Sequence, residues 1–144
     1  MEFPLPVAYG MEEVDLGLRL HANGGRVLRS RQLRVFHDTD LGRHAAAAVT
    51  AASLTNIMLL AYLRYPRRFW GIAAVQCVKR IGWLLRNGRW TGIGAGLAHV
   101  PGTITMYRQR RQPVSGRALR SYWALRRNPV PAGRGMDAAP APKD

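Results

Sequence analysis

Carboxylates are missing from most of this sequence. None of the eight acidic residues lies between Leu41 and Met136, whereas sixteen of the 22 basic residues do. Charges of one sign without counter-charges cannot be neutralised by internal salt bridges, so they must face water or an anionic partner. The sequence therefore predicts a phospholipid surface or a nucleic acid as the partner of this basic region, with a solvated surface as the plainer alternative.

Cysteines and a secretory signal are also lacking. Cys77 is the single cysteine, which excludes a disulfide framework and a zinc site built from cysteines. It stands in an apolar run with no histidine nearby, so a buried structural thiol is expected rather than a nucleophile. No secretory signal is expected, because the sequence opens with Glu2 and reaches Glu12 and Glu13 before any long apolar run.

The composition divides the chain into three zones. A hydrophobic content of 47% over 144 residues excludes an entirely disordered chain and suits one ordinary domain. Residues 1–40 are expected to belong to a soluble α/β domain, and residues 41–128 to form a basic helical extension. Residues 129–144, rich in Pro, Gly and Ala, are expected to be a disordered tail. The expected fold class is therefore α+β, but mainly α.

The first zone predicts one helix followed by two strands. The helix covers residues 12–22, because its acidic first turn suits the helix dipole and the Asn-Gly-Gly at 23–25 supplies a C-cap. Two short runs with alternating apolar residues, at 26–29 and 32–37, are expected to be strands.

The second zone begins with a long uncharged segment. Residues 45–63 carry no formal charge over 19 residues, which nearly reaches the roughly 20 residues that span a membrane. Polar residues interrupt it, namely Thr50, Ser53, Thr55 and Asn56. A helix packed on protein or lying in the membrane interface is therefore favoured over a span, and both remain open.

A second helix is expected over residues 67–86. It carries bulky apolar side chains and tryptophans on one side and cations on another, a pattern typical of helices that lie in a membrane interface. The residues expected to contact the membrane are Trp70, Trp83, Lys79 and Arg80.

Residues 93–135 are expected to hold a Gly-rich connector and one more helix. Gly92, Gly94 and Gly96 follow no strand, so close packing of helices is favoured over a nucleotide-binding loop. The helix is expected to begin after Ser115, whose side chain suits an N-cap.

The densest group of carboxylates is Glu12, Glu13 and Asp15, all within one helical turn. Such a group could hold a general base near a sugar hydroxyl or contact a metal. On spacing alone, a patch that compensates the helix dipole is the favoured alternative. His37, at the end of an expected strand, is a weaker candidate.

The region around these carboxylates resembles a known motif. Residues 9–20, Tyr-Gly-Met-Glu-Glu-Val-Asp-Leu-Gly-Leu-Arg-Leu, are similar to the acceptor-side motif of family 2 glycosyltransferases. In that family an acidic pair is followed by the pattern x-Asp/Glu-Leu-x-x-Arg-hydrophobic. A Gly, a strand with a Val-Leu pair and a second strand ending in Val-x-His come next. Here these are Gly24-Gly25, Val27-Leu28 and Val35-Phe36-His37. The Leu-x-Tyr-Pro at 63–66 and Arg-x-Pro-Val-Ser at 111–115 resemble the extensions of bacterial members.

The resemblance implies roles for individual residues. Glu13 matches the catalytic base, usually an aspartate, which takes the proton of the acceptor hydroxyl so that the oxygen attacks the anomeric carbon and inverts it. Glu12 would orient the acceptor or the loop, and Asp15 and Arg19 match helix-anchoring positions. His37 matches a histidine near the donor diphosphate and its divalent metal, Mg²⁺ or Mn²⁺.

The resemblance also implies a larger enzyme. Family members bind the nucleotide-sugar donor with an N-terminal half and an Asp-x-Asp motif, and the Asp-x-Asp at 38–40 here follows the base motif instead. The chain is therefore expected to be the C-terminal piece of a GT-A α/β transferase domain followed by amphipathic membrane-associated helices, and inactive alone. The implied acceptor is a glycan or lipid-linked molecule of cell-envelope synthesis.

The expected location is the cytoplasmic face of a bacterial inner membrane, either peripheral or with one marginal membrane helix. A small basic peripheral membrane protein without enzymatic activity is the main alternative. Nucleic-acid binding is the least favoured, because no known nucleic-acid motif is present and the tryptophans stand in apolar runs.

Overall fold

A computed structural model describes residues 10–27 and 47–130 of the chain. In order, the helices are α1 (Glu12–Ala22), α2 (Ala47–Arg64), the 3₁₀ turn η2 (Arg67–Phe69), α3 (Trp70–Arg86), α4 (Ile93–Tyr107), the 3₁₀ turn η3 (Arg108–Arg110) and α5 (Gly116–Arg127). This part of the chain is helical and contains no strand, which confirms the mainly α part of the expected fold class. The expected strand at 32–37, half of that at 26–29 and residues 131–144 lie outside the described residues.

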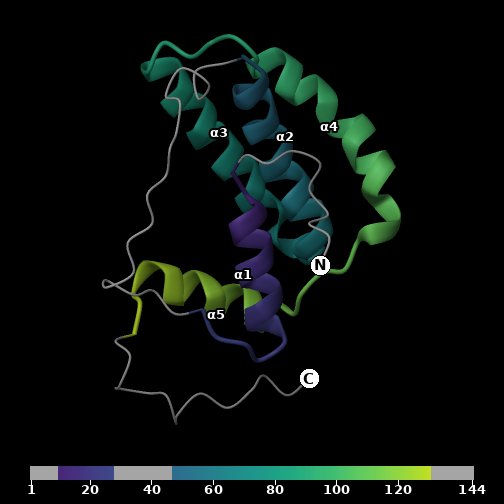
Figure 1. The fold of residues 1–144 in the computed structure, drawn as a ribbon, viewed down its shortest axis with the longest axis vertical. Coiled ribbons are helices and arrows are strands. Elements are labelled where there is room, and N and C mark those ends of the chain that lie inside the picture. Colours follow the sequence, from purple (N-terminus) through teal and green to yellow (C-terminus); the bar gives the residue numbers. More distant parts are fainter. Residues whose placement is uncertain (1–9, 28–46, 131–144) are drawn as a thin grey trace, which may run out of the picture.

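Helix α2 is the centre of the arrangement. Figure 1 shows α3 and α4 on opposite sides of α2, while α5 crosses one end of α1. The leucines of α2 are fully buried, and its hydroxyl side chains bond to backbone carbonyls, as Ser53 does to Thr50 and Thr55 does to Ala51. Polar residues can therefore occupy the middle of an apolar helix without leaving their hydroxyls unsatisfied.

By length and composition alone, α2 could cross a membrane. Its 18 residues have a mean hydropathy of 1.3, but 67% of this stretch is buried inside the protein, as in the core helix of a soluble fold. The expected alternative of a helix packed on protein is thus the one the structure shows.

Glycines bring α4 against α2 at close range. A Cβ atom at Gly96 would lie 2.7 Å from the carbonyl oxygen of Ala51, and one at Gly92 would also collide with α2. The hydroxyl of Thr55 lies 2.9 Å from the carbonyl oxygen of Gly96 and links the two helices. Close packing is confirmed for Gly92 and Gly96, whereas Gly94 has no neighbour within 4 Å and faces away.

The prediction of a connector in this region is wrong for residues 93–107, which form a helix. Gly94, Gly96 and Gly102 lower helix propensity, and Pro101 cannot donate its backbone hydrogen bond within the helix. Tertiary packing on α2 overrides these local penalties, because the glycines permit a backbone approach that no other residue allows.

Helix α1 joins the same core as the basic extension. Val14 and Leu18 of α1 pack in one buried cluster with Leu60 of α2 and Leu119 of α5. Helices α1, α2 and α5 therefore share one buried cluster.

The helix ends follow the predicted capping residues. Helix α1 covers Glu12–Ala22 as expected, and Gly24 follows it with a positive φ of 79° while its neighbour Gly25 bonds back to Leu20. Ser115 caps α5, with its hydroxyl oxygen accepting a hydrogen bond from the backbone nitrogen of Ala118 at 3.1 Å. Both predictions are confirmed because cap residues act locally.

Candidate functional site

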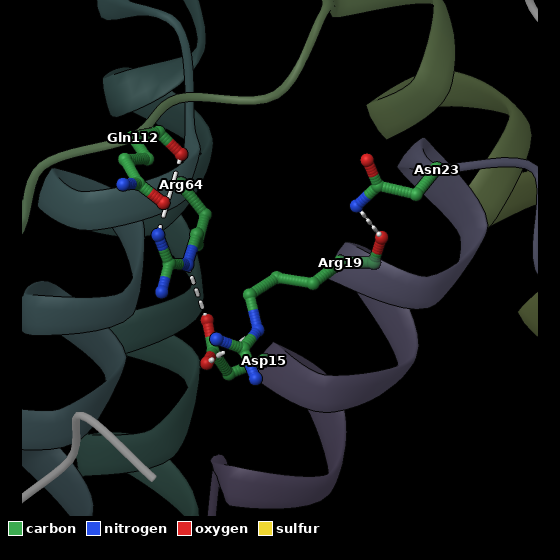
Figure 2. A network of polar contacts seen from close by, with 5 residues as sticks. All are labelled: Asp15, Arg19, Asn23, Arg64 and Gln112. Atoms are coloured by element: carbon green, nitrogen blue, oxygen red, sulfur yellow. Dashed lines mark hydrogen bonds and ion pairs between the residues drawn. The ribbon is translucent and has the colours of Figure 1, made fainter. Parts of the chain in front are cut away.

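A buried ion pair fixes α1 on the core. Asp15 is completely buried, and its Oδ1 accepts a hydrogen bond from Nε of Arg64 on α2 at 2.5 Å. Arg19, one turn along α1, lies 3.5 Å from the other carboxylate oxygen of Asp15 (Figure 2). Arg64 also reaches the backbone oxygen of Gln112, so one guanidinium ties α1, α2 and the segment before α5 together.

Within this network, Asp15 is the residue of α1 that pairs with α2, and Arg19 lies beside it. Arg64 is 3% exposed, so both charges of the pair are removed from water and depend on each other. The expectation that the basic residues between 41 and 136 form no internal salt bridge is wrong for Arg64, because its partner Asp15 lies far away in the sequence. The one feature of the sequence that indicates this pairing is that α2, which is otherwise uncharged, ends in an arginine.

Glu12 is turned back onto the loop that precedes α1. Its Oε2 accepts a hydrogen bond from the backbone nitrogen of Met11 at 2.8 Å. Partial burial raises the pKa of Glu12, but backbone hydrogen bonds from Met11, Glu12 and Gly10 outweigh it and hold the pKa below its usual value. The carboxylate of Glu12 therefore stays charged and holds the loop before α1.

Glu13 differs from its neighbours because its side chain is exposed. It lies one turn before Gly17 and two turns before His21, so these three residues form one stripe along α1. The stripe faces α5, since the hydroxyl oxygen of Tyr122 lies 2.9 Å from the position of a Cβ atom at Gly17. The ring of His21 lies 6.1 Å from that of Tyr122.

The pKa of Tyr122 is raised by the groups around its hydroxyl. Burial raises the pKa of Tyr122, Arg126 lowers it and the charge of Glu13 raises it further. Tyr122 is thus a neighbour of the Glu13 stripe that the sequence did not indicate, and the guanidinium of Arg126 lies 6.0 Å from the centre of its ring. The one feature of the sequence that indicates such a neighbour is Gly17, because a glycine on the face of a helix allows a large side chain to approach the backbone.

Two further features of the expected site are His37 and a divalent metal. His37 lies outside the described residues. In the described ranges, no three His, Cys, Asp or Glu residues gather where they could hold a metal ion. Asp15 is engaged by Arg64 and Glu12 by the backbone, so the acidic cluster does not form a metal site by itself.

The four residues predicted to contact a membrane all lie on α3 but in different surroundings. Lys79 is exposed, and Trp70 is 39% exposed beside the ring of Tyr62. Trp83 is 44% exposed, and the guanidinium of Arg80 stacks on its ring at 4.6 Å. Arg80 is thereby held against the protein and does not point freely into solvent.

The outer side of α3 exposes apolar side chains that the core does not use. Ala73, Cys77 and Leu84 form its buried stripe, and burial raises the pKa of the Cys77 thiol, as expected for a structural cysteine. On the opposite side the exposed apolar residues are Ile72, Val75, Val78 and Leu85, with Lys79 and Arg86 beside them. This stripe of exposed apolar side chains has the cations Lys79 and Arg86 within it, and both kinds of side chain suit a helix that lies on an anionic membrane interface.

In comparisons with known proteins, no family model, curated protein or solved structure matches the chain. Functional assignment therefore rests on the motif around Glu13 and on the geometry of the described helices.

Proposed function

We propose that this chain is the acceptor-side part of an inverting glycosyltransferase that resembles family 2, and that Glu13 is its catalytic base. The nucleotide-sugar donor would be bound by a half of the enzyme outside residues 1–144. The observation that carries the proposal is the contrast within one helical turn: Asp15 is buried and paired, whereas Glu13 is exposed.

The anchored helix explains how this contrast serves catalysis. A general base must be held within hydrogen-bond reach of the hydroxyl whose proton it takes. The pair between Asp15 and Arg64 fixes α1 on α2, while Glu12 fixes the preceding loop. The carboxylate of Glu13 is therefore held in place while it remains accessible to a ligand. Acidic residues that only compensate the helix dipole would not need to be held in this way.

The chemical step follows from these positions. A carboxylate oxygen of Glu13 takes the proton as the acceptor oxygen forms its bond to the anomeric carbon, and the bond from that carbon to the diphosphate breaks. The nucleoside diphosphate leaves from the opposite side, so the configuration inverts. A divalent metal would stabilise the leaving diphosphate, and its ligands would come from the donor-binding half.

Stereochemistry tests this proposal. The polypeptide that joins these residues to a nucleotide-sugar-binding half is expected to transfer a sugar with inversion, because attack by the acceptor oxygen is a single displacement. The product's anomeric configuration can be measured by proton NMR. A product with retained configuration would overturn the proposal, and so would the absence of transfer to any hydroxyl acceptor.

We further propose that α3 lies on an anionic membrane surface, at the cytoplasmic face of the inner membrane of a bacterium. The exposed stripe on α3 supplies apolar contact, while Lys79 and Arg86 supply attraction to acidic headgroups. With α2 buried as the core helix, peripheral attachment through α3 is favoured over a membrane span. A glycosyltransferase attached in this way could reach a lipid-linked acceptor.

Binding to vesicles tests the membrane contact. Val78→Asp places a charge on the stripe at a residue that is 68% exposed, so folding should be retained. Losing a buried valine costs about 1.5 kcal/mol or more, so affinity for phosphatidylglycerol vesicles should fall at least about tenfold in sedimentation. Val130→Asp, the same change at an exposed valine outside α3, should bind as the wild type does. Equal binding by all three proteins would rule out α3 as the contact.

A peripheral membrane protein without enzymatic activity remains the alternative, favoured by the same stripe on α3. The two functions differ in what Glu13 does. In the alternative, its replacement has no consequence beyond a change of surface charge.

A further inference from the structure

Two arginines from different elements gather on the ring of Phe69. The guanidinium carbon of Arg68, in η2, lies 5.1 Å from the centre of this ring, and that of Arg120, on α5, lies 5.9 Å from it. The ring is itself held in place, because it packs edge to face with Trp123 at a distance of 5.9 Å between the ring centres. Phe69 therefore restricts two long cationic side chains that would otherwise sample many rotamers.

A glycine allows Arg68 to lie across the start of α5. Gly116 is the first residue of α5 and is buried, and a Cβ atom there would collide with Nη2 of Arg68. The same Cβ atom would also lie 3.0 Å from the ring of Phe69. A residue with a side chain at this position would therefore push the guanidinium of Arg68 away from the first turn of α5.

A third arginine joins these two at the first turn of α5. Arg117 follows Gly116, and it lies three residues before Arg120, so Arg117 and Arg120 are neighbours on one side of the helix. The side chains of Arg68, Arg117 and Arg120 are all exposed, so none of them serves to fill the core. The start of a helix favours acidic residues, yet the first turn of α5 contains none. These three residues, the α5 arginine cluster, thus place like charges where folding alone would favour the opposite sign.

We propose that the α5 arginine cluster binds a phosphate group with two charges, as in a phosphomonoester or a diphosphate. A guanidinium that stacks on a ring with its face keeps the N–H donors of its edge for a ligand, and these donors match two oxygens of a phosphate. Arg68 and Arg120 supply such donors from two elements, and Arg117 supplies a third positive charge. The inference concerns binding alone, so it depends neither on sugar transfer nor on the contact between α3 and a membrane.

Calorimetric titration of the 144-residue chain with inorganic pyrophosphate tests the proposal. Saturable binding is expected, and Arg68→Gln and Arg120→Gln should each weaken it about tenfold, as for the loss of a charge-assisted hydrogen bond. Arg127→Gln makes the same charge change at an exposed residue roughly 15 Å away, at the other end of α5, and should change the affinity less than about twofold. Equal losses in all three variants would show unspecific attraction to a basic protein and overturn the site, as would the absence of saturable binding.

Gly116→Ala tests the position of Arg68 without changing any charge. The added methyl group should displace the guanidinium, so the affinity for pyrophosphate should fall about fivefold, as for one lost hydrogen bond. Alanine is the better helix former, so the circular dichroism spectrum should be retained. Gly94→Ala makes the same change on α4, where a Cβ atom has no neighbour within 4 Å, and should bind as the wild type does. Unchanged affinity in Gly116→Ala would contradict a site built around Arg68.

Vesicles distinguish a lipid headgroup from a soluble phosphate as the source of the bound group. Phosphatidic acid carries a phosphomonoester, whereas phosphatidylglycerol carries a phosphodiester, and the stripe on α3 should not distinguish vesicles of the two lipids that are matched in surface charge. A preference for phosphatidic acid that Arg68→Gln abolishes would identify a lipid headgroup, and equal binding to both vesicles with pyrophosphate binding retained would identify a soluble phosphate. Binding of an oligonucleotide through the same arginines, without binding of pyrophosphate, would overturn the proposal in favour of a nucleic-acid backbone.

Discussion

Glu13→Gln is expected to abolish nearly all sugar transfer by the polypeptide that joins these residues to a nucleotide-sugar-binding half. An amide keeps the size of the side chain but cannot accept the proton of the acceptor hydroxyl, so kcat should fall about 10²–10⁴-fold. Donor binding should be retained, because the nucleotide contacts lie in the other half. Rates of nucleotide release in the presence of acceptor, together with donor affinity by calorimetry, measure the two effects separately.

Two variants control for charge and for shape. Glu13→Asp restores a carboxylate, the usual residue of the resembling family, and should recover much of the lost rate. Gln109→Lys makes the same change in net charge at an exposed residue of η3 and should leave turnover unchanged. Full turnover by Glu13→Gln would reject Glu13 as the base and favour the membrane-binding alternative.

The local features of this fold could be predicted from the sequence. The bounds of α1 and the cap at Ser115 depend on residues that are neighbours in the chain, and the structure confirms them. The helix expected over 67–86 is also present, as the 3₁₀ turn Arg67–Phe69 followed by the α-helix Trp70–Arg86. The burial of Cys77 followed from its apolar surroundings in the same way. Such signals survive folding because capping and amphipathic patterns are local properties.

Features that depend on contacts between distant residues could not be predicted. Helix α4 has poor local propensity and forms because Gly92 and Gly96 fit against α2. In the candidate site, the sequence indicated Glu12, Glu13 and Asp15 but not their different surroundings, which Arg64, Tyr122 and the backbone of Met11 provide. Three carboxylates of one turn thus acquire three different environments only through tertiary structure.

The second large effect is expected on stability, from the pair between Asp15 and Arg64. Asp15→Asn should lower the free energy of unfolding by about 3–5 kcal/mol, because it leaves the buried guanidinium of Arg64 without its counter-charge. Arg64→Met should have a cost of similar size, since it leaves the carboxylate of Asp15 buried and without its closest partner. Urea unfolding of the 144-residue chain, followed by circular dichroism, measures both changes.

Arg19→Met and a double variant show whether pairing, and not burial alone, sets this cost. Arg19 is partly exposed and lies 3.5 Å from Asp15, so its replacement should cost no more than about 1 kcal/mol. The double variant Asp15→Leu with Arg64→Met removes both charges and should be more stable than either single change, because replacing a whole buried pair by apolar residues is often neutral. Additive losses in the double variant would contradict an energetically coupled pair. Since this pair alone joins α1 to α2 by charge among the described residues, its loss should also release the turn that presents Glu13.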